Sequence, residues 1–191
     1  MNDLPAPKVL ASGKYLRLLS QGHWEFAERV NATGAVVIVA LTDERRLLLV
    51  EQYRIPVGCS VIELPAGLVG DAPEAKSPAR RQSSADDSAA ELAETARREL
   101  LEETGYEAAE MRLLGGGPVS AGLSNEGITF FHATGLRRLH QGGGVDHEQI
   151  TVHELPLAEL DAWLKLRTDE GLMIDPKIFA GLWLMQHSSG A

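Results

Sequence analysis

The chain of 191 residues carries 27 Asp and Glu against 18 Lys and Arg, a formal charge of −9, and 44% of its residues are hydrophobic. This length favours one domain with a sizeable core. The acidic balance argues against a protein whose main partner is nucleic acid, since phosphate backbones require basic patches. A small phosphorylated substrate stays compatible with it, because metal ions bridge carboxylates to phosphate oxygens.

Signals for secretion and for membrane insertion are missing from the sequence. Met1–Lys8 lacks the apolar stretch of a signal peptide. Apolar runs such as Ala35–Leu41 are far too short to span a membrane. Cys59 is the single cysteine, so no intramolecular disulfide is possible. We therefore expect a cytoplasmic protein with no membrane partner.

The first half of the chain is predicted to be rich in β-strands. Val9–Leu19 and His23–Val30 form a β-rich beginning. Ala35–Leu41 is a continuous, largely β-branched run, typical of a strand that is covered on both faces. After the polar turn Thr42–Arg46, Leu47–Tyr53 is predicted to be the returning strand of a hairpin. Further short strands are expected at Val61–Leu64, Met111–Leu114, Ile128–Thr134 and Gln149–Leu155.

Helical periodicity occurs in two parts of the chain. Ser88 and Glu91 have the spacing of a capping box at the start of the first helix, and Gly105 stands where a glycine would end it. Near the C-terminus, Leu157–Leu166 and Pro176–Gln186 predict two more helices. The apolar stripe of the first helix consists of Ala89, Leu92, Ala93, Ala96 and Leu100.

One segment, residues 72–87, differs in composition from the rest. It is dominated by proline, serine, alanine and charge, and it contains no large apolar residue. Such a segment buries too little surface to offset the entropy of ordering it. We therefore expect a small β element over residues 1–32, then a main domain over residues 33–191 with a flexible insertion at 72–87.

The most informative stretch is Arg98–Tyr106. At ~100° per residue, Glu102 and Glu103 fall within about 60° of Glu99, so three carboxylates crowd one helix face. Like charges repel at this spacing, whereas Mg²⁺ and Mn²⁺ favour such a cluster of hard oxygen ligands. The alternative is an acidic, solvated helix face, on which Arg98 would pair with Glu94.

The flanking residues resemble the Nudix box, G-x5-E-x7-R-E-U-x-E-E-x-G-U, in which U is a bulky apolar residue. Upstream, Glu63–Gly67 is similar to the strand and loop that open the box, with Gly67 as its first glycine. Tyr106 is an acceptable last residue of the pattern. The matching positions of the second half are Arg98, Glu99, Leu100, Glu102, Glu103 and Gly105.

The resemblance has one departure in spacing. Gly67 and Arg98 lie 31 positions apart, whereas the family pattern separates glycine and arginine by 14. The surplus coincides with the low-complexity segment. Counting back from Arg98 places Ala90 at the middle acidic position of the pattern, and Glu91 and Glu74 are imperfect substitutes for it.

Within the family, three motifs resemble ADP-ribose and related ADP-sugar pyrophosphatases. They are Val50–Arg54, Glu63–Gly67 and Ser120–Glu126, although the group usually has proline where this chain has Ala121. In that group the strand arginine helps to hold substrate and the loop glutamate assists catalysis. The resemblance places these roles on Arg54 and Glu126, each of which could otherwise be an ordinary surface residue.

The resemblance implies a set of site residues and a reaction. Metal ligands would be Glu99, Glu102, Glu103 and the backbone carbonyl of Ala66, holding Mg²⁺ or Mn²⁺. Arg98 would orient the glutamates, Glu126 would be the general base, and Glu102 would take part in catalysis. Substrate would be bound by Arg54, Glu63 and Gly67. The reaction would be attack of water on the P–O–P linkage of ADP-ribose or a related ADP-sugar, giving AMP and a sugar phosphate.

The implied fold is the α/β/α sandwich of the Nudix family, with a mixed β-sheet between helices. Val9–Val30 is long enough to exchange strands in a homodimer, which we expect. Trp24, Trp163 and Trp183 are interpreted as core or dimer-contact residues, and Gly115–Gly117 as a flexible turn. The alternatives to the leading function are a pyrophosphatase for another nucleotide sugar such as GDP-mannose, and a nucleotide sensor without turnover.

Overall fold

The computed structural model describes residues 4–70, 85–145 and 149–188. No helix in these three ranges is long and apolar enough to cross a membrane. In chain order, the elements are β1 (Lys8–Ser12), β2 (Leu16–Gln21), β3 (Trp24–Arg29), β4 (Gly34–Ala40), β5 (Arg46–Arg54), β6 (Cys59–Glu63), β7 (Ala66–Val69), α1 (Ala85–Thr104), β8 (Tyr106–Pro118), β9 (Gly127–Arg138), β10 (Thr151–Pro156), η3 (Leu157–Glu159), α2 (Leu160–Asp169), β11 (Met173–Ile174) and α3 (Lys177–His187).

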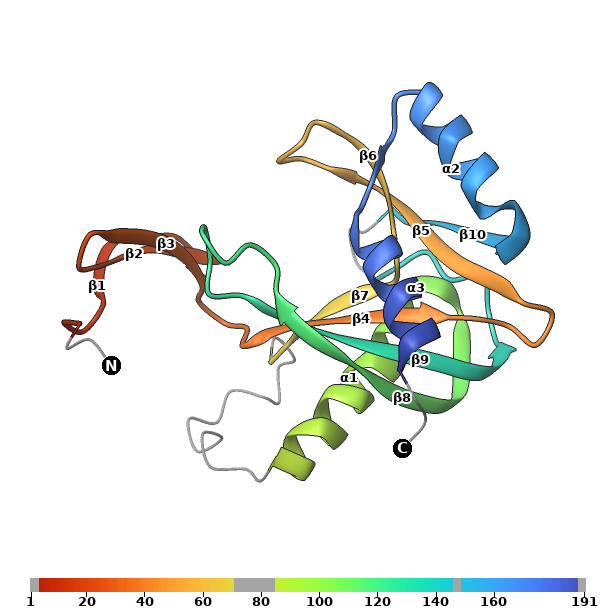
Figure 1. Cartoon of the computed structure of the whole chain (residues 1–191), viewed down its shortest axis with the longest axis horizontal. Helices are drawn as coiled ribbons and strands as arrows, with labels where there is room; N and C mark the ends of the chain where they lie inside the picture. Colours follow the sequence, from red (N-terminus) through yellow and green to blue (C-terminus); the bar gives the residue numbers. More distant parts are fainter. Residues whose placement is uncertain (1–3, 71–84, 146–148, 189–191) are drawn as a thin grey trace.

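The described strands form three sheets (Figure 1). The first has the order β1-β2-β3 and is antiparallel throughout. The second has the order β7-β4-β9-β8, in which β4 and β9 run parallel and the other pairs antiparallel. The third has the order β10-β5-β6-β11, with β11 parallel to β6. The second and third sheets are therefore mixed, as the family resemblance implies.

Strand β4 contributes side chains to both halves of the core. Successive side chains of a strand point to opposite faces of its sheet. On one face, Val36 and Ile38 pack in a cluster with Ala96 of α1. On the other face, Val37 and Val39 pack in a second cluster with Ile178 of α3. Helices thus cover both faces of this sheet, and the predicted α/β/α sandwich is confirmed.

Helix α1 confirms the predicted stripe and corrects the predicted start. Ala96 and Leu100 are fully buried, and Leu92 packs against the same cluster. Gly105 ends the helix with a φ of 76° and donates its N–H to the Leu101 carbonyl. The helix begins at Ala85, so the capping box at Ser88 is wrong.

The boundaries of the predicted insertion change for the same reason. Residues 72–84 lie outside the described part of the chain, whereas 85–87 belong to α1. The sequence from Ala85 to Ala90 is rich in alanine and has aspartates where a first helical turn favours them. A composition rule based on missing large apolar residues did not distinguish this helical turn from the insertion.

The predicted hairpin between the strands at 35–41 and 47–53 is wrong. Strand β4 belongs to the second sheet and β5 to the third, where β5 pairs with β6 and β10. A single isolated bridge, Leu41 to Leu47, joins the two segments across the turn. Both strands are apolar on both faces, so no alternation of polar and apolar residues specified which strand each would pair with.

Of the remaining predictions, some are confirmed and others are wrong. The two C-terminal helices are confirmed as η3 with α2, and as α3. Gly115–Gly117 is no flexible turn, because it pairs with β9 inside β8, where the register shifts at a bulge. Trp163 is partly buried against the core, but Trp24 and Trp183 are 50% and 59% exposed, so a core role for these two is wrong.

Candidate active site

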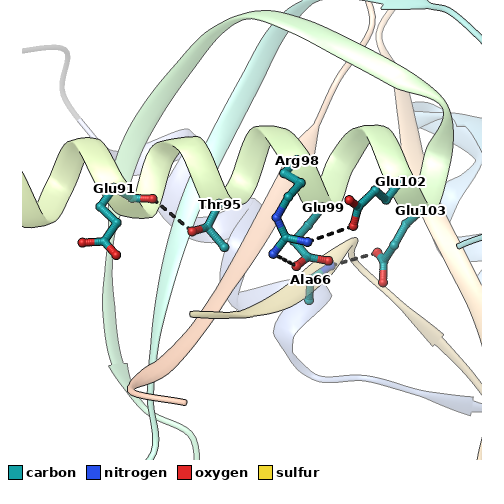
Figure 2. A network of polar contacts seen from close by, with 7 residues as sticks. All are labelled: Ala66, Glu91, Thr95, Arg98, Glu99, Glu102 and Glu103. Carbon is teal, nitrogen blue, oxygen red and sulfur yellow. Dashed lines mark hydrogen bonds and ion pairs between the residues drawn. The ribbon is translucent and has the colours of Figure 1, made fainter. Parts of the chain in front are cut away.

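The acidic face of α1 is held together by Arg98 (Figure 2). Its guanidinium donates to a Glu99 carboxylate oxygen at 2.6 Å and to a Glu102 carboxylate oxygen at 2.9 Å. The Glu102 bond spans one helical turn, and the Glu99 bond joins neighbouring residues. The charge-assisted bonds fix where these two carboxylates lie on the helix.

Strand β7 meets this face of α1 at its first two residues. The backbone N–H of Ala66 donates to a Glu103 carboxylate oxygen at 3.0 Å, and Glu103 is only 5% exposed. A Cβ added to Gly67 would lie 1.9 Å from the carboxyl carbon of Glu99. Glycine at position 67 therefore allows the strand to approach the helix closely enough for Glu99 to lie against it.

These residues match a divalent cation in the chemistry of their donors. Carboxylate and carbonyl oxygens are the ligands that Mg²⁺ and Mn²⁺ prefer, and Gly67 keeps the space beside Glu99 free of a side chain. Within the described ranges, however, no three His, Cys, Asp or Glu side chains are grouped as metal ligands. Arg98 and the Ala66 amide hold the carboxylates in this arrangement, so cation binding requires them to turn toward a common point.

The middle acidic position of the pattern has no carboxylate here. Ala90 is an exposed residue of α1. Glu91 lies two turns before Glu99, and its backbone carbonyl accepts a hydrogen bond from the Thr95 hydroxyl at 3.0 Å (Figure 2). Glu74 lies outside the described residues. The acidic group on α1 is thus built from its last two turns.

Glu126 is positioned by the N-terminal sheet. The Arg29 side chain of β3 forms an ion pair and hydrogen bond with the Glu126 carboxylate. The loop before Glu126 also joins β3 through its backbone, since Ala27 donates to the Leu123 carbonyl at 2.8 Å. Arg29 was not predicted from the sequence. Nothing in a short strand indicates that one of its side chains pairs with Glu126, which lies 97 residues later in the chain.

A cavity of about 480 Å³ lies next to this loop. It is bounded by the ends of the strands of the second sheet and by α1, with Thr33, Leu92 and Gly127 among its lining residues. Gly127 directly follows Glu126, and Val69 of the lining lies two residues after Gly67. The cavity therefore lies between the Glu126 loop and Val69, the last residue of β7.

Arg54 and Glu63 form a second charged group, carried by strands β5 and β6. Arg54 on β5 donates to the Glu63 carboxylate on β6 at 2.6 Å. Burial raises the pKa of the Glu63 carboxyl; Arg54 and Lys177 lower it, and the Asp175 carboxylate raises it. Two of the three predicted substrate-binding residues are thus brought together, whereas Gly67 lies with Glu99.

Asp175 and Lys177 complete this charged group and were missed from the sequence. The Lys177 ammonium forms an ion pair with Asp175, which also accepts the Lys177 backbone N–H at 2.8 Å. The Asp175 N–H donates to the carbonyl of Ile62, the residue before Glu63. An aspartate before Pro176, at the start of a predicted helix, is visible in the sequence, but its proximity to Glu63 is not.

Comparisons with known proteins agree on one family. A model of the NUDIX domain matches residues 32–172. The methanol dehydrogenase activator of Bacillus methanolicus is 32% identical over 163 residues, which cover 81% of this chain and 78% of that protein. The ADP-ribose pyrophosphatase of Bacillus subtilis is 30% identical over 163 residues, with the same two shares.

Two further matches bear on substrate and fold. The GDP-mannose pyrophosphatase of Citrobacter koseri is 33% identical over 141 residues, 69% of this chain and 64% of that protein. The crystal structure of an ADP compounds hydrolase aligns with a TM-score of 0.65, covering 97% of this chain and 95% of that one. At 19% sequence identity, this second likeness shows the fold alone.

Proposed function

The chain belongs to the Nudix family and is a Nudix hydrolase, and from this premise we propose that it hydrolyses the pyrophosphate bond of ADP-ribose or a related ADP-sugar. The products would be AMP and a sugar phosphate. The observation that carries the proposal is the acidic face of α1, where Glu99, Glu102 and Glu103 gather around Arg98 and the Ala66 amide. The likeness to the Bacillus subtilis enzyme supports the choice of substrate.

The acidic face of α1 is proposed to hold Mg²⁺ or Mn²⁺. Glu99, Glu102 and Glu103 would be the carboxylate ligands, and the Ala66 carbonyl would be a fourth. When bound, the cation neutralises charge on the phosphate oxygens and lowers the pKa of a bound water. Arg98 orients Glu99 and Glu102 through the bonds already described. Glu102 thus serves both the metal and catalysis.

Glu126 is proposed as the general base. A carboxylate takes a proton from, or orients, the water that attacks phosphorus, if it lies within hydrogen-bond reach of that water. Here the Arg29 ion pair holds Glu126, and the next residue, Gly127, lines the 480 Å³ cavity. A substrate phosphate that pairs with Arg29 would free the Glu126 carboxylate to face the water.

Arg54, Glu63 and Gly67 are proposed to bind substrate. Arg54 is partly exposed and remains held by Glu63 at one of its nitrogens, so other guanidinium N–H groups can reach a phosphate or a ribose hydroxyl. Gly67 would act through its backbone, since a side chain there would collide with Glu99.

A homodimer formed through the N-terminal sheet is proposed as the working unit. Sheet β1-β2-β3 exposes large apolar side chains, including Val9, Leu16 and Trp24, each at least half exposed. Exposed apolar patches on a small sheet commonly mark protein interfaces. Elution as a monomer at micromolar concentration would contradict this part of the proposal. We propose that the dimer is cytoplasmic. Disulfides are rare in the reducing cytoplasm, and a chain whose single cysteine is Cys59 forms none within itself.

A second substrate class has support of its own. The match to GDP-mannose pyrophosphatase favours another nucleotide sugar with the same bond chemistry. The deciding experiment is a product assay with ADP-ribose, GDP-mannose, other nucleotide sugars and NADH, each with Mg²⁺, with Mn²⁺ and with EDTA. Metal-dependent release of AMP and ribose 5-phosphate from ADP-ribose, with little from the others, is the expected result.

The other outcomes identify what has failed. Turnover of GDP-mannose in place of ADP-ribose would keep the site residues and change the substrate. Nucleotide binding without turnover of any substrate would show a sensor and overturn the hydrolase. Full activity in EDTA would overturn the role of the acidic face of α1 in metal binding.

A further inference from the structure

The charged group around Glu63 contains two cations and two carboxylates from separate parts of the chain. Arg54 comes from β5, Glu63 from β6, and Asp175 and Lys177 from the turn into α3. Among the described residues, the charged groups that act on Glu63 are Arg54, Asp175 and Lys177. Glu63 and Asp175 are both largely buried, with side chains 11% and 10% exposed.

The backbone keeps Asp175 close to Glu63. Strand β11 runs parallel to β6, with Ile174 opposite Ile62. The Asp175 N–H then donates to the Ile62 carbonyl at 2.9 Å. Two nearby carboxylates in a buried position cannot both stay ionised without cations, and one of them otherwise takes up a proton. Arg54 neutralises one of these carboxylates and Lys177 the other.

We propose that Lys177 and Asp175 are positioning residues for substrate binding: Lys177 neutralises Asp175, so Glu63 stays ionised and holds the Arg54 guanidinium in place. The raised pKa of Glu63 is consistent with this dependence, because burial and Asp175 both favour its protonated form. A protonated Glu63 holds Arg54 through a weaker, neutral hydrogen bond, and the long arginine side chain regains its rotamer freedom. This inference rests on the proposed role of Arg54 in binding substrate.

The first variant is Lys177→Met, which keeps the length of the side chain and removes its charge. We expect KM for the substrate to rise while kcat stays within about twofold, because each unit by which the Glu63 pKa rises lowers its ratio of ionised to protonated form tenfold. Since Lys177 lowers the pKa of Glu63, its loss raises that pKa further. The KM defect should therefore shrink as the pH rises.

Three matched variants separate positioning from other roles. Lys177→Arg keeps the charge and should restore KM. The double variant Asp175→Asn with Lys177→Met removes the repelling carboxylate as well, keeps an oxygen to accept the Lys177 backbone N–H, and should also restore KM. Lys165→Met is the control, because its partner Asp169 is an exposed i,i+4 residue on α2, and it should leave KM unchanged.

A substrate-independent readout keeps this inference distinct from the proposed function. Carbon-13 NMR of labelled glutamate should show the Glu63 carboxyl titrating at higher pH in Lys177→Met and returning in the double variant. If Arg54→Ala leaves KM unchanged while this titration shifts, the role of Arg54 in the proposed function fails and the charge coupling stands. If the Glu63 titration is the same in all variants, or if the double variant keeps the KM defect, the inference is overturned.

Discussion

The two charged groups of this protein are built in opposite ways. The acidic face of α1 draws Arg98, Glu99, Glu102 and Glu103 from six consecutive residues, three carboxylates with one guanidinium. The group around Glu63 combines two carboxylates with two cations from the neighbouring strands β5 and β6 and from the distant start of α3. The first has an excess of negative charge in its own sequence, whereas the second is balanced.

This difference separates two functions that carboxylates can serve. A helix turn with an excess of like charge gains stability from a cation, which suits metal binding and catalysis. A balanced, buried group gains nothing from a further ion, and its charges instead restrict where a side chain such as Arg54 can lie. Removing a charge from the acidic face of α1 should therefore mainly affect kcat. Removing a charge from the group around Glu63 should mainly affect KM and the stability of the fold.

The largest effect is expected at the acidic face of α1. Glu103→Gln removes a proposed metal ligand and should lower turnover by more than the ~10²–10⁴-fold expected for a general base. The affinity for Mn²⁺, measured by calorimetry, should fall together with kcat. Near-wild-type turnover in this variant would contradict the assignment of the metal site.

Glu126→Gln should have the next largest effect. If Glu126 is the general base, turnover should fall by about 10²–10⁴-fold while binding of a non-hydrolysable substrate analogue persists. Glutamine still accepts a hydrogen bond from Arg29 but cannot take a proton. A matching loss in Arg29→Gln would instead point to the ion pair itself as the functional element.

Gly67→Ala tests the close approach of β7 to α1. The new methyl group would meet the Glu99 carboxylate, so Glu99 must move. A misplacement of about 1 Å can cost roughly 10²-fold, and we expect kcat to fall by about tenfold to a hundredfold with an unchanged melting temperature. Gly13→Ala is the control, since its Cβ would be in ordinary contact at 3.4 Å. Equal activities of the two variants would contradict this account of Gly67.

Glu63→Gln should have the smallest effect on rate and a distinct effect on stability. Because the folded protein raises the Glu63 pKa above 4.5, the protonated form is favoured by folding, and that stability is lost as the pH rises through the folded pKa. Glutamine stays neutral, so this variant should melt at the same or a slightly higher temperature at pH 8, with no such gain below pH 4.5.

The matched control for stability is Glu107→Gln, whose partner Arg137 is largely exposed. An exposed ion pair contributes little to the stability of the fold. The melting temperature of Glu107→Gln should therefore equal that of the wild type at pH 8 and at pH 4. If Glu63→Gln melts at a lower temperature than the wild type at pH 8, Glu63 stabilises the fold as a charged group, and the expected stability effect is wrong.

Much of the first group could be predicted from the sequence because its information is local. The apolar stripe of α1, the terminal Gly105 and the three glutamates follow from residue spacing along one helix. The family pattern added Gly67, and the structure supplies the reason, which is the position of Glu99 beside it.

The sheet pairings and the second group depended on contacts that no local pattern encodes. Strands β4 and β5 are buried on both faces, so their periodicity could not show that they belong to different sheets. The sequence by itself determined the helix faces, the acidic turn and the family, because short-range spacing sets these. Only the tertiary structure placed Arg29 on Glu126 and Asp175 with Lys177 near Glu63, because these contacts depend on which strands pair and on which carboxylates burial brings together.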